Sequence, residues 1–429
     1  MKRGLILLQC VFSVLLMQAR GWSQERPNGF YLTSPLSLSS GYDENFVVNS
    51  IARSDAVSVL TSPTFAWLRS TPRSTFSADY QPEFEIFARD QNLNAWNHSA
   101  TLRYTYRING RLSMDAGDSF LSTSDASRQL AESQFLLPLG RYQENSFFAG
   151  LKYRLDHRTL LFFRFDQAIT TMTLSGPLGN GLDQAAYAGS MTLDHTVSRH
   201  HSFTGSYSYL HVRPLDGIGT AGYSYQAVNS LHAGYMYTVN PDLIFRVTGG
   251  GVHGREFAYT AGGAVEKQYR GLWMIAGYQR YLSFFGGLAA NSGTAGETVP
   301  FANGLQPNSL FQAVSLRIRG HLTKRVGLEF KGERGRSSLG DRSVRSLILQ
   351  SRLDYRLSER VILFARAEYY GQNISQFSES PLSRRRYFGG LEFVLSRPPQ
   401  LEDTARRHGK APTESVEPQT GEPQAPEER

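Results

Sequence analysis

The stretch Ser146–Thr170 predicts two β-strands joined by a tight turn, and this pattern constrains the fold more than any other feature of the sequence. Charged residues such as Arg164 and Asp166 alternate there with large apolar residues, which are Leu151, Tyr153, Leu155, Leu161, Phe163 and Phe165. Successive side chains of a strand point to opposite faces, so each strand has one apolar and one charged face. The apolar face must lie in a core or against lipid.

The same hairpin pattern recurs along the chain, for example at 101–117, where Asn109-Gly110 is a strong turn signal. We count about 18 strands, each close to the ~9–11 residues that cross a membrane in a barrel. They are predicted at 41–51, 57–69, 74–88, 98–107, 111–121, 146–155, 159–170, 186–196, 201–212, 227–238, 243–255, 268–279, 283–291, 309–320, 325–335, 343–356, 360–371 and 385–395. A count of about 16 follows if 41–51 and 283–291 are not strands.

This count places every tight turn on one side and the longer polar segments, such as 122–145, on the other. Bacterial outer-membrane barrels have short periplasmic turns, long outer loops and an even number of strands. The sequence therefore predicts an all-β fold, a transmembrane antiparallel β-barrel over 41–395. The alternative is a soluble sandwich or propeller whose charged face is solvated.

The two ends of the chain differ from this pattern. Residues 1–23 have Lys2 and Arg3 before a short apolar stretch, which predicts a secretory signal peptide. Cys10 is the only cysteine of the 429 residues and lies in that signal, so we expect no disulfide in the exported protein. A polar segment follows at 24–40. Residues 396–429 are rich in Pro and Glu and predict a disordered periplasmic tail.

A net charge of +8 is typical of proteins that bind nucleic acid. Export argues against such a partner here, and so does the spread of the arginines over strands and turns. With the apolar faces turned to lipid, twelve basic residues point inward: Arg103, Arg107, Lys152, Arg154, Arg164, Arg246, Arg317, Arg319, Lys331, Arg352, Arg356 and Arg366. Five acidic residues accompany them: Asp156, Asp166, Glu329, Asp354 and Glu368. Charged rings set ion preference in a pore, so we expect pore-lining arginines and passage of anionic solutes.

Aromatic residues gather near the predicted strand ends, where a membrane barrel has its aromatic girdles. They are Tyr104, Tyr106, Tyr153, Tyr235, Tyr237, Tyr355, Tyr369 and Tyr370.

No residue set predicts catalysis, a cofactor or a metal. Asn97-His98-Ser99 holds the residue types used by outer-membrane phospholipase A, but neighbours on a strand point to opposite faces and cannot converge. His195, His200 and His201 lie close in sequence without acidic or cysteine partners at zinc-like spacing, and a turn rich in histidine is the simpler interpretation. Enzymatic activity is therefore an alternative that we do not favour.

Two short motifs resemble known families. Gly390-Leu391-Glu392-Phe393-Val394-Leu395 resembles the terminal strand that the barrel-assembly machinery recognises, although 34 residues follow it here. Gly41-Tyr42-Asp43-Glu44-Asn45-Phe46 is similar to the opening of outer-membrane β-barrel porins associated with exopolysaccharide export. The second resemblance implies an outer-membrane barrel with a transport role. It leaves a calcium site at Asp43 and Glu44 as an alternative to a polar turn.

The favoured function is porin-like passage of hydrophilic, mainly anionic solutes across the outer membrane, with a link to polysaccharide export implied by resemblance alone. A structural or docking barrel with a closed lumen is the alternative. The expected partners are outer-membrane lipid, the barrel-assembly machinery, and a periplasmic protein that binds the tail at 396–429.

Overall fold

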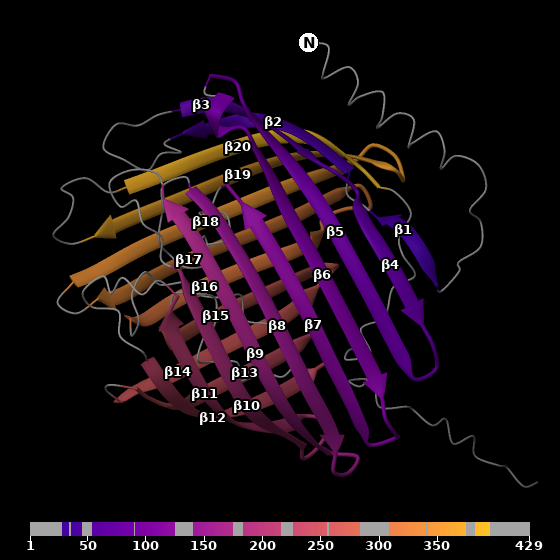
Figure 1. The fold of residues 1–429 in the computed structure, drawn as a ribbon, viewed down its shortest axis with the longest axis vertical. Coiled ribbons are helices and arrows are strands. Elements are labelled where there is room, and N and C mark those ends of the chain that lie inside the picture. Colours follow the sequence, from indigo (N-terminus) through magenta and orange to yellow (C-terminus); the bar gives the residue numbers. More distant parts are fainter. Residues whose placement is uncertain are drawn as a thin grey trace, which may run out of the picture. The chain divides into compact units, whose positions relative to one another are not determined.

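The computed structural model describes residues 28–33, 36–44, 54–89, 91–124, 140–174, 183–215, 226–254, 257–283, 309–339, 342–374 and 382–394. The signal peptide at 1–23 and the tail at 396–429 lie outside these residues and stay predictions. The described chain is almost entirely antiparallel β-sheet (Figure 1). Among the described residues, none belongs to a helix that has the length and hydropathy to cross a membrane.

The sheet contains twenty strand segments and one 3-10 helix, η1 (Gln91–Leu93). The segments are β1 (Gly29–Thr33), β2 (Leu36–Glu44), β3 (Ser54–Thr61), β4 (Thr64–Ser70), β5 (Ser74–Phe87), β6 (Ala95–Arg107), β7 (Leu112–Thr123), β8 (Gly140–Arg154), β9 (Thr159–Leu174), β10 (Gln184–Thr196), β11 (His201–Pro214), β12 (Gln226–Asn240), β13 (Leu243–His253), β14 (Phe257–Tyr269), β15 (Leu272–Ser283), β16 (Ser309–His321), β17 (Val326–Leu339), β18 (Arg342–Arg356), β19 (Val361–Ile374) and β20 (Leu382–Phe393).

These segments form the wall of a closed barrel. β1 and β2 are two parts of one wall strand, because β1 pairs with β4 while β2 pairs with β3. β3 and β4 likewise both pair with β5 and form the next wall strand. β2 also lies beside β20 (Figure 1) and pairs with it. The barrel therefore closes with 18 strands. The predicted count is confirmed, and we call the β2–β20 contact the seam.

The connections differ between the two ends of the barrel, as predicted. Tight turns join β5 to the preceding β4, and β6 to β7, β8 to β9 and so on around one end, which we call the turn end. The longer connections lie at the other end, the loop end, where 284–308 is the longest. Two connections at the loop end are nevertheless short, at 254–256 and 340–341. The chain after β20 leaves at the turn end, where the Val394 amide donates to the Arg360 carbonyl at 2.8 Å.

The first wall strand begins earlier than predicted. The prediction placed a strand at 41–51 after a polar segment at 24–40, but β1 and β2 lie within 29–44. Serines alternate with apolar residues here, and Leu38 is 54% exposed on the outer side. A strand with Ser37 and Ser39 on its inner face meets the requirements of a polar interior, and its inward charge comes only at Asp43, near the loop end. Residues 45–53 lie outside the described chain.

The predicted strands 268–279 and 283–291 are also wrong, because the turn lies at Arg270-Gly271 and not near Tyr281. Both turn residues have positive φ, 45° for Arg270 and 85° for Gly271. Two central residues with positive φ match the right-handed twist of a tight hairpin, and glycine takes the second position at no steric cost. The strand count stayed correct because both strands shifted together. Residues 284–308 are outside the described chain.

Asp156 closes the turn between β8 and β9 instead of facing the interior, which corrects its predicted position. Its carboxylate accepts hydrogen bonds from the amides of Arg158 at 2.6 Å and Thr159 at 2.8 Å. The Arg158 amide is the main reason that the pKa of Asp156 is lowered. Because the charged form is favoured in the folded turn, this contribution to stability is present above the ordinary aspartate pKa and is lost as pH falls through the lowered one.

We therefore expect Asp156 to titrate below the ordinary aspartate pKa of about 3.9. Carbon NMR of the labelled side-chain carboxyl group in detergent micelles measures this directly. The hydrogen exchange of the Thr159 amide should quicken over the same pH range, and Asp156→Asn should remove that pH dependence. Titration of Asp156 at or above the ordinary value would contradict the assignment.

Candidate functional site

The wall has a polar face and an apolar face. Residues that pair directly across neighbouring strands lie on the same face of a sheet. Followed around the closed barrel, the register places most of the charged residues on one face, which includes Asp43, Glu85 and Arg384. These three side chains are 0%, 1% and 1% exposed, whereas Leu231 on the other face is 66% exposed. The polar face therefore encloses the interior.

The register places all ten predicted pore-lining arginines on this inner face, together with Lys152 and Lys331. Each of the twelve lies in the half of its strand that is nearer the turn end. The ten are Arg103 and Arg107 on β6, Arg154 on β8, Arg164 on β9, Arg246 on β13, Arg317 and Arg319 on β16, Arg352 and Arg356 on β18, and Arg366 on β19.

The predicted excess of basic over acidic residues on the inner face is wrong. Among residues whose side chains the structure describes, the register gives fourteen basic and fifteen acidic residues on this face. Arg384 and Arg386 are added to the basic set. The acidic ones are Asp43, Asp55, Asp79, Glu83, Glu85, Asp115, Glu144, Asp166, Asp194, Glu266, Glu329, Glu333, Asp354, Glu368 and Glu392.

The two signs are not evenly distributed along the barrel. By strand position, the half of the inner face nearer the turn end holds twelve basic and eight acidic residues. The half nearer the loop end holds two basic and seven acidic residues. Some of the acidic residues near the loops are held in the wall by hydrogen bonds. Glu83, for example, accepts from Thr61 at 3.1 Å and from Asn97 at 3.2 Å.

Several basic residues near the turn end are neutralised by carboxylates. Arg164 pairs with Asp166 at 2.7 Å and Arg246 with Glu266 at 3.2 Å. Arg352 contacts both Asp354 and Glu392, and Arg366 contacts Glu368. Residues two apart on a strand share a face, which is why the i, i+2 pairs form.

Seven basic residues have no carboxylate within ion-pair distance among the residues that the structure describes. They are Arg103, Arg107, Lys152, Arg154, Arg317, Arg319 and Arg356. Arg107 donates to the Pro72 carbonyl at 2.8 Å, and the Lys152 ammonium lies 5.3 Å from the centre of the Phe162 ring. These contacts position the side chains and leave their charge intact. The basic residues of the described interior that form no ion pair therefore lie at the turn end.

A buried ionic cluster at the seam was not predicted. Arg384 binds Asp43 through two nitrogens, at 2.8 and 2.5 Å, and the Arg386 Nε lies 3.2 Å from the same carboxylate. Arg386 also reaches Glu368 at 3.5 Å. Asp43 is on β2, the arginines on β20 and Glu368 on β19, so the cluster joins the first and last wall strands. Asp43 is thus an ion-pair partner, and the described residues contain no group of three or more potential metal ligands.

The apolar face carries aromatic residues at both ends of the strands. Seven of the eight predicted girdle tyrosines lie on it, among them Tyr104 and Tyr106, whose rings stack 6.4 Å apart. Tyr370 is the exception, because it faces inward, is 6% exposed and accepts a hydrogen bond from Gln350. A closed sheet with an apolar outside, aromatic ends and a charged inside meets the conditions for crossing a bilayer with strands. The chain has the architecture of a transmembrane β-barrel.

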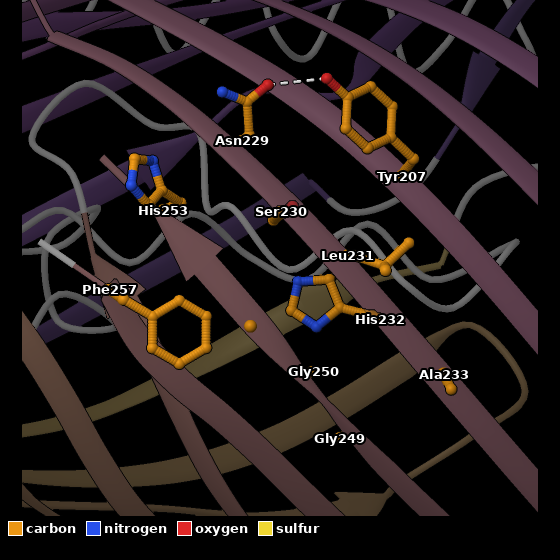
Figure 2. A pocket seen from close by; sticks show the side chains of 11 residues that line it. Tyr207, Asn229, Ser230, Leu231, His232, Ala233, Gly249, Gly250, His253 and Phe257 are labelled. Carbon is orange, nitrogen blue, oxygen red and sulfur yellow. Dashed lines mark hydrogen bonds between the residues drawn. The ribbon is translucent and has the colours of Figure 1, made fainter. Parts of the chain in front are cut away.

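The outer wall of the barrel has a hollow over β11–β14. It has a volume of about 620 Å³. Its lining includes Leu231, Ala233, Gly249 and Phe257 (Figure 2). Glycines on β13 leave space between the larger side chains of β12 and β14. The Tyr207 hydroxyl donates to the Asn229 side chain at 2.7 Å at one edge of this hollow (Figure 2).

The residues weighed for catalysis do not converge. Asn97 and Ser99 face the interior, whereas His98 lies on the outer face, where its ring stacks on Tyr80 at 6.2 Å. The turn histidines bind the chain itself: His200 contacts the Thr238 carbonyl at 2.6 Å, and His201 the Tyr235 hydroxyl at 2.7 Å.

The predicted assembly signal lies in the strand that closes the barrel. Gly390 faces inward and Phe393 outward on β20, and Leu395 lies outside the described residues. Its recognition by the assembly machinery stays a prediction.

No family model and no curated protein matches the chain. Among solved structures, the barrel is similar to Pseudomonas aeruginosa OccK2 (OpdF) in complex with glucuronate, with 12% identity and a TM-score of 0.47 over 85% of this chain and 98% of that one. A BenF-like porin from Pseudomonas fluorescens Pf-5 has 10% identity and a TM-score of 0.46, over 84% of this chain and 97% of that one. The siderophore receptor PirA from Pseudomonas aeruginosa has 10% identity and a TM-score of 0.41, over 84% of this chain and 80% of that one. Likenesses this distant assign no function.

Proposed function

We propose that the barrel passes small hydrophilic solutes across the outer membrane and favours anions. The observation that supports this most directly is the set of seven unpaired basic side chains at the turn end of the interior. Charged groups that line a pore set its ion preference, and a wall of low dielectric strengthens their field. The preference comes from the distribution of free charge, since the total of basic and acidic residues on the inner face is nearly balanced.

The acidic residues near the loop end oppose this preference, but ion pairs offset part of their charge. Arg384 and Arg386 there are paired with Asp43 and Glu368, and Glu83 accepts hydrogen bonds from the wall. Glu144 accepts a hydrogen bond from the Tyr142 hydroxyl. An anion that reaches the turn end meets seven basic side chains that form no ion pair with a described carboxylate.

Replacing Arg317 and Arg319 with glutamate should shift selectivity from anions towards cations. The change reverses two charges on the inner face of β16, and we expect the anion-to-cation permeability ratio to fall by roughly tenfold. The reversal potential in planar bilayers across a salt gradient measures this ratio. Arg69→Glu/Lys267→Glu is the matched control, because both residues are exposed on the outer face near the same end.

An unchanged reversal potential in the Arg317→Glu/Arg319→Glu variant would show that these residues do not line the conducting path. If the unmodified barrel conducts no ions, the lumen is closed, and a docking or structural role takes the place of transport. A part in polysaccharide export stays a prediction that rests on the resemblance of residues 41–46.

A further inference from the structure

One row of directly paired residues runs across the outer face from β11 to β19. Each member pairs with the next one on the neighbouring strand. The row is Gly205, Ala233, Gly249, Ala261, Arg280, Gln312, Arg336, Arg345 and Asn373. Its first four members are small, and the remaining five are basic or amide side chains. We call the four small residues the trough and the five basic or amide residues the basic row.

The basic row contains a pair of like charges that destabilises the wall when no anion is bound. Arg336 and Arg345 pair directly, and both are exposed. Like charges directly opposite on a sheet destabilise the pair. Within the described chain neither guanidinium has an ion-pair partner. An anion between the two would convert the repulsion into two charge-assisted hydrogen bonds, and arginine binds phosphate well through its planar fork.

The row rises across the wall because barrel strands are tilted by ~35–45°. Gly205 lies four residues from the turn end of β11, whereas Asn373 lies next to the last residue of β19 at the loop end. The trough is therefore beside the hydrocarbon and the arginines are near the outer headgroups. Arg280 stacks on Tyr259 at 3.5 Å from the ring centre, as expected where aromatic and basic residues meet headgroups.

The trough has open space above its glycines. It overlaps the hollow of about 620 Å³ in Figure 2. Leu231 and Val247, at 66% and 58% exposed, stand on either side of Ala233 and Gly249. A Cβ atom at Gly249 would have only the Thr260 carbonyl oxygen nearby, at 4.0 Å. The space above this glycine is open.

We propose that the row binds a bisphosphorylated glycolipid of the outer leaflet. Strands lie ~4.8 Å apart, so Arg280 on β15 and the Arg336–Arg345 pair on β17 and β18 are about 12 Å apart across the wall. That separation suits a headgroup with two phosphates at opposite ends. One phosphate lies between Arg336 and Arg345, the other at Arg280, and an acyl chain enters the trough beside Ala261.

Native mass spectrometry of the full-length protein in detergent tests the headgroup contacts, with diphosphoryl lipid A, monophosphoryl lipid A and phosphatidylethanolamine as probes. We expect the diphosphoryl form to be retained best. Arg336→Gln/Arg345→Gln should lower its bound fraction by roughly tenfold. Arg69→Gln/Lys267→Gln removes two positive charges from the outer face near the turn end and should bind like the unmodified protein. Equal binding by the two double variants, or equal retention of the three lipids, would overturn the proposal.

Two further measurements test the trough and the source of the phosphate. Gly249→Leu should fill the trough and weaken lipid A binding, whereas Gly189→Leu should not, since it lies on the outer face outside the trough with no atom within 4 Å of its Cβ position. Normal binding by Gly249→Leu would overturn the acyl-chain placement. Inorganic phosphate should not displace lipid A, and displacement would indicate a free-anion site instead. Gel mobility before and after boiling confirms that each variant is folded.

Discussion

Asp43→Asn is expected to destabilise the folded barrel by about 3–5 kcal/mol, because it removes one partner of a buried ion pair and leaves the others unbalanced. The Asp43 carboxylate is fully buried and contacts both Arg384 and Arg386. An asparagine keeps the shape but cannot neutralise two guanidinium groups. These groups belong to the strand that closes the barrel, so the loss should appear as opening of the seam.

The measurement is the temperature at which the fast, folded band is lost on a gel run in mild detergent without boiling. Glu44→Gln is the matched control on the same strand pair. Glu44 pairs with Arg385 at 3.5 Å, but these side chains are 41% and 51% exposed, and exposed pairs contribute about 0–1 kcal/mol. Equal loss of stability in the two variants would show that burial of the Asp43 pair does not hold the seam.

A double-mutant cycle separates the pair from its surroundings. Arg384→Gln alone should also be strongly destabilising, and Asp43→Asn/Arg384→Gln should lose less than the sum of the single changes. Strict additivity would mean that the two side chains do not stabilise each other, and that the seam depends on packing alone.

Alternation was enough to predict most of the wall from the sequence. The strands around Ser146–Thr170 were found because apolar and charged residues alternate there, and the register places the two kinds on opposite faces. The first wall strand was predicted to begin too late, because serines occupy the inner face of Leu36–Glu44 before Asp43. The Arg270-Gly271 turn was missed because arginine is an unusual residue for positive φ.

The inner face was predicted only in part, and the reason is physical. Arginines next to large apolar residues marked the strands, so the basic residues were assigned correctly to one face. The acidic residues near the loop end, such as Glu83 and Glu144, lie where the alternation is weak and escaped the count. The seam cluster joins residues 341 apart in sequence. No local pattern links Asp43 with Arg384, because their contact depends on closure of the whole barrel.

Glycine at the seam has a steric role that its place in the predicted assembly signal does not reveal. A Cβ atom at Gly390 would lie 2.5 Å from the Leu38 carbonyl oxygen and 2.8 Å from the Ser39 Cβ. At Gly41 it would lie 1.9 Å from the Tyr387 carbonyl oxygen and 2.9 Å from the Phe388 Cα. Both positions face inward where β2 and β20 approach each other. The two strands can pair this closely only if these residues lack side chains.

Gly41→Ala is therefore expected to destabilise the barrel by about 3 kcal/mol, the upper range for overpacking, because backbone atoms of β20 must move. Thermal loss of the folded band, measured on protein refolded into detergent without assembly factors, tests the steric role alone. Gly389→Ala is the matched control, since its Cβ would face outward with the Phe364 carbonyl oxygen 3.9 Å away, in ordinary contact. If both variants unfold at the same temperature, the close approach of β2 and β20 does not require glycine. If only Gly41→Ala is weakened, the seam glycines are needed for closure itself, whatever recognises the last strand during assembly.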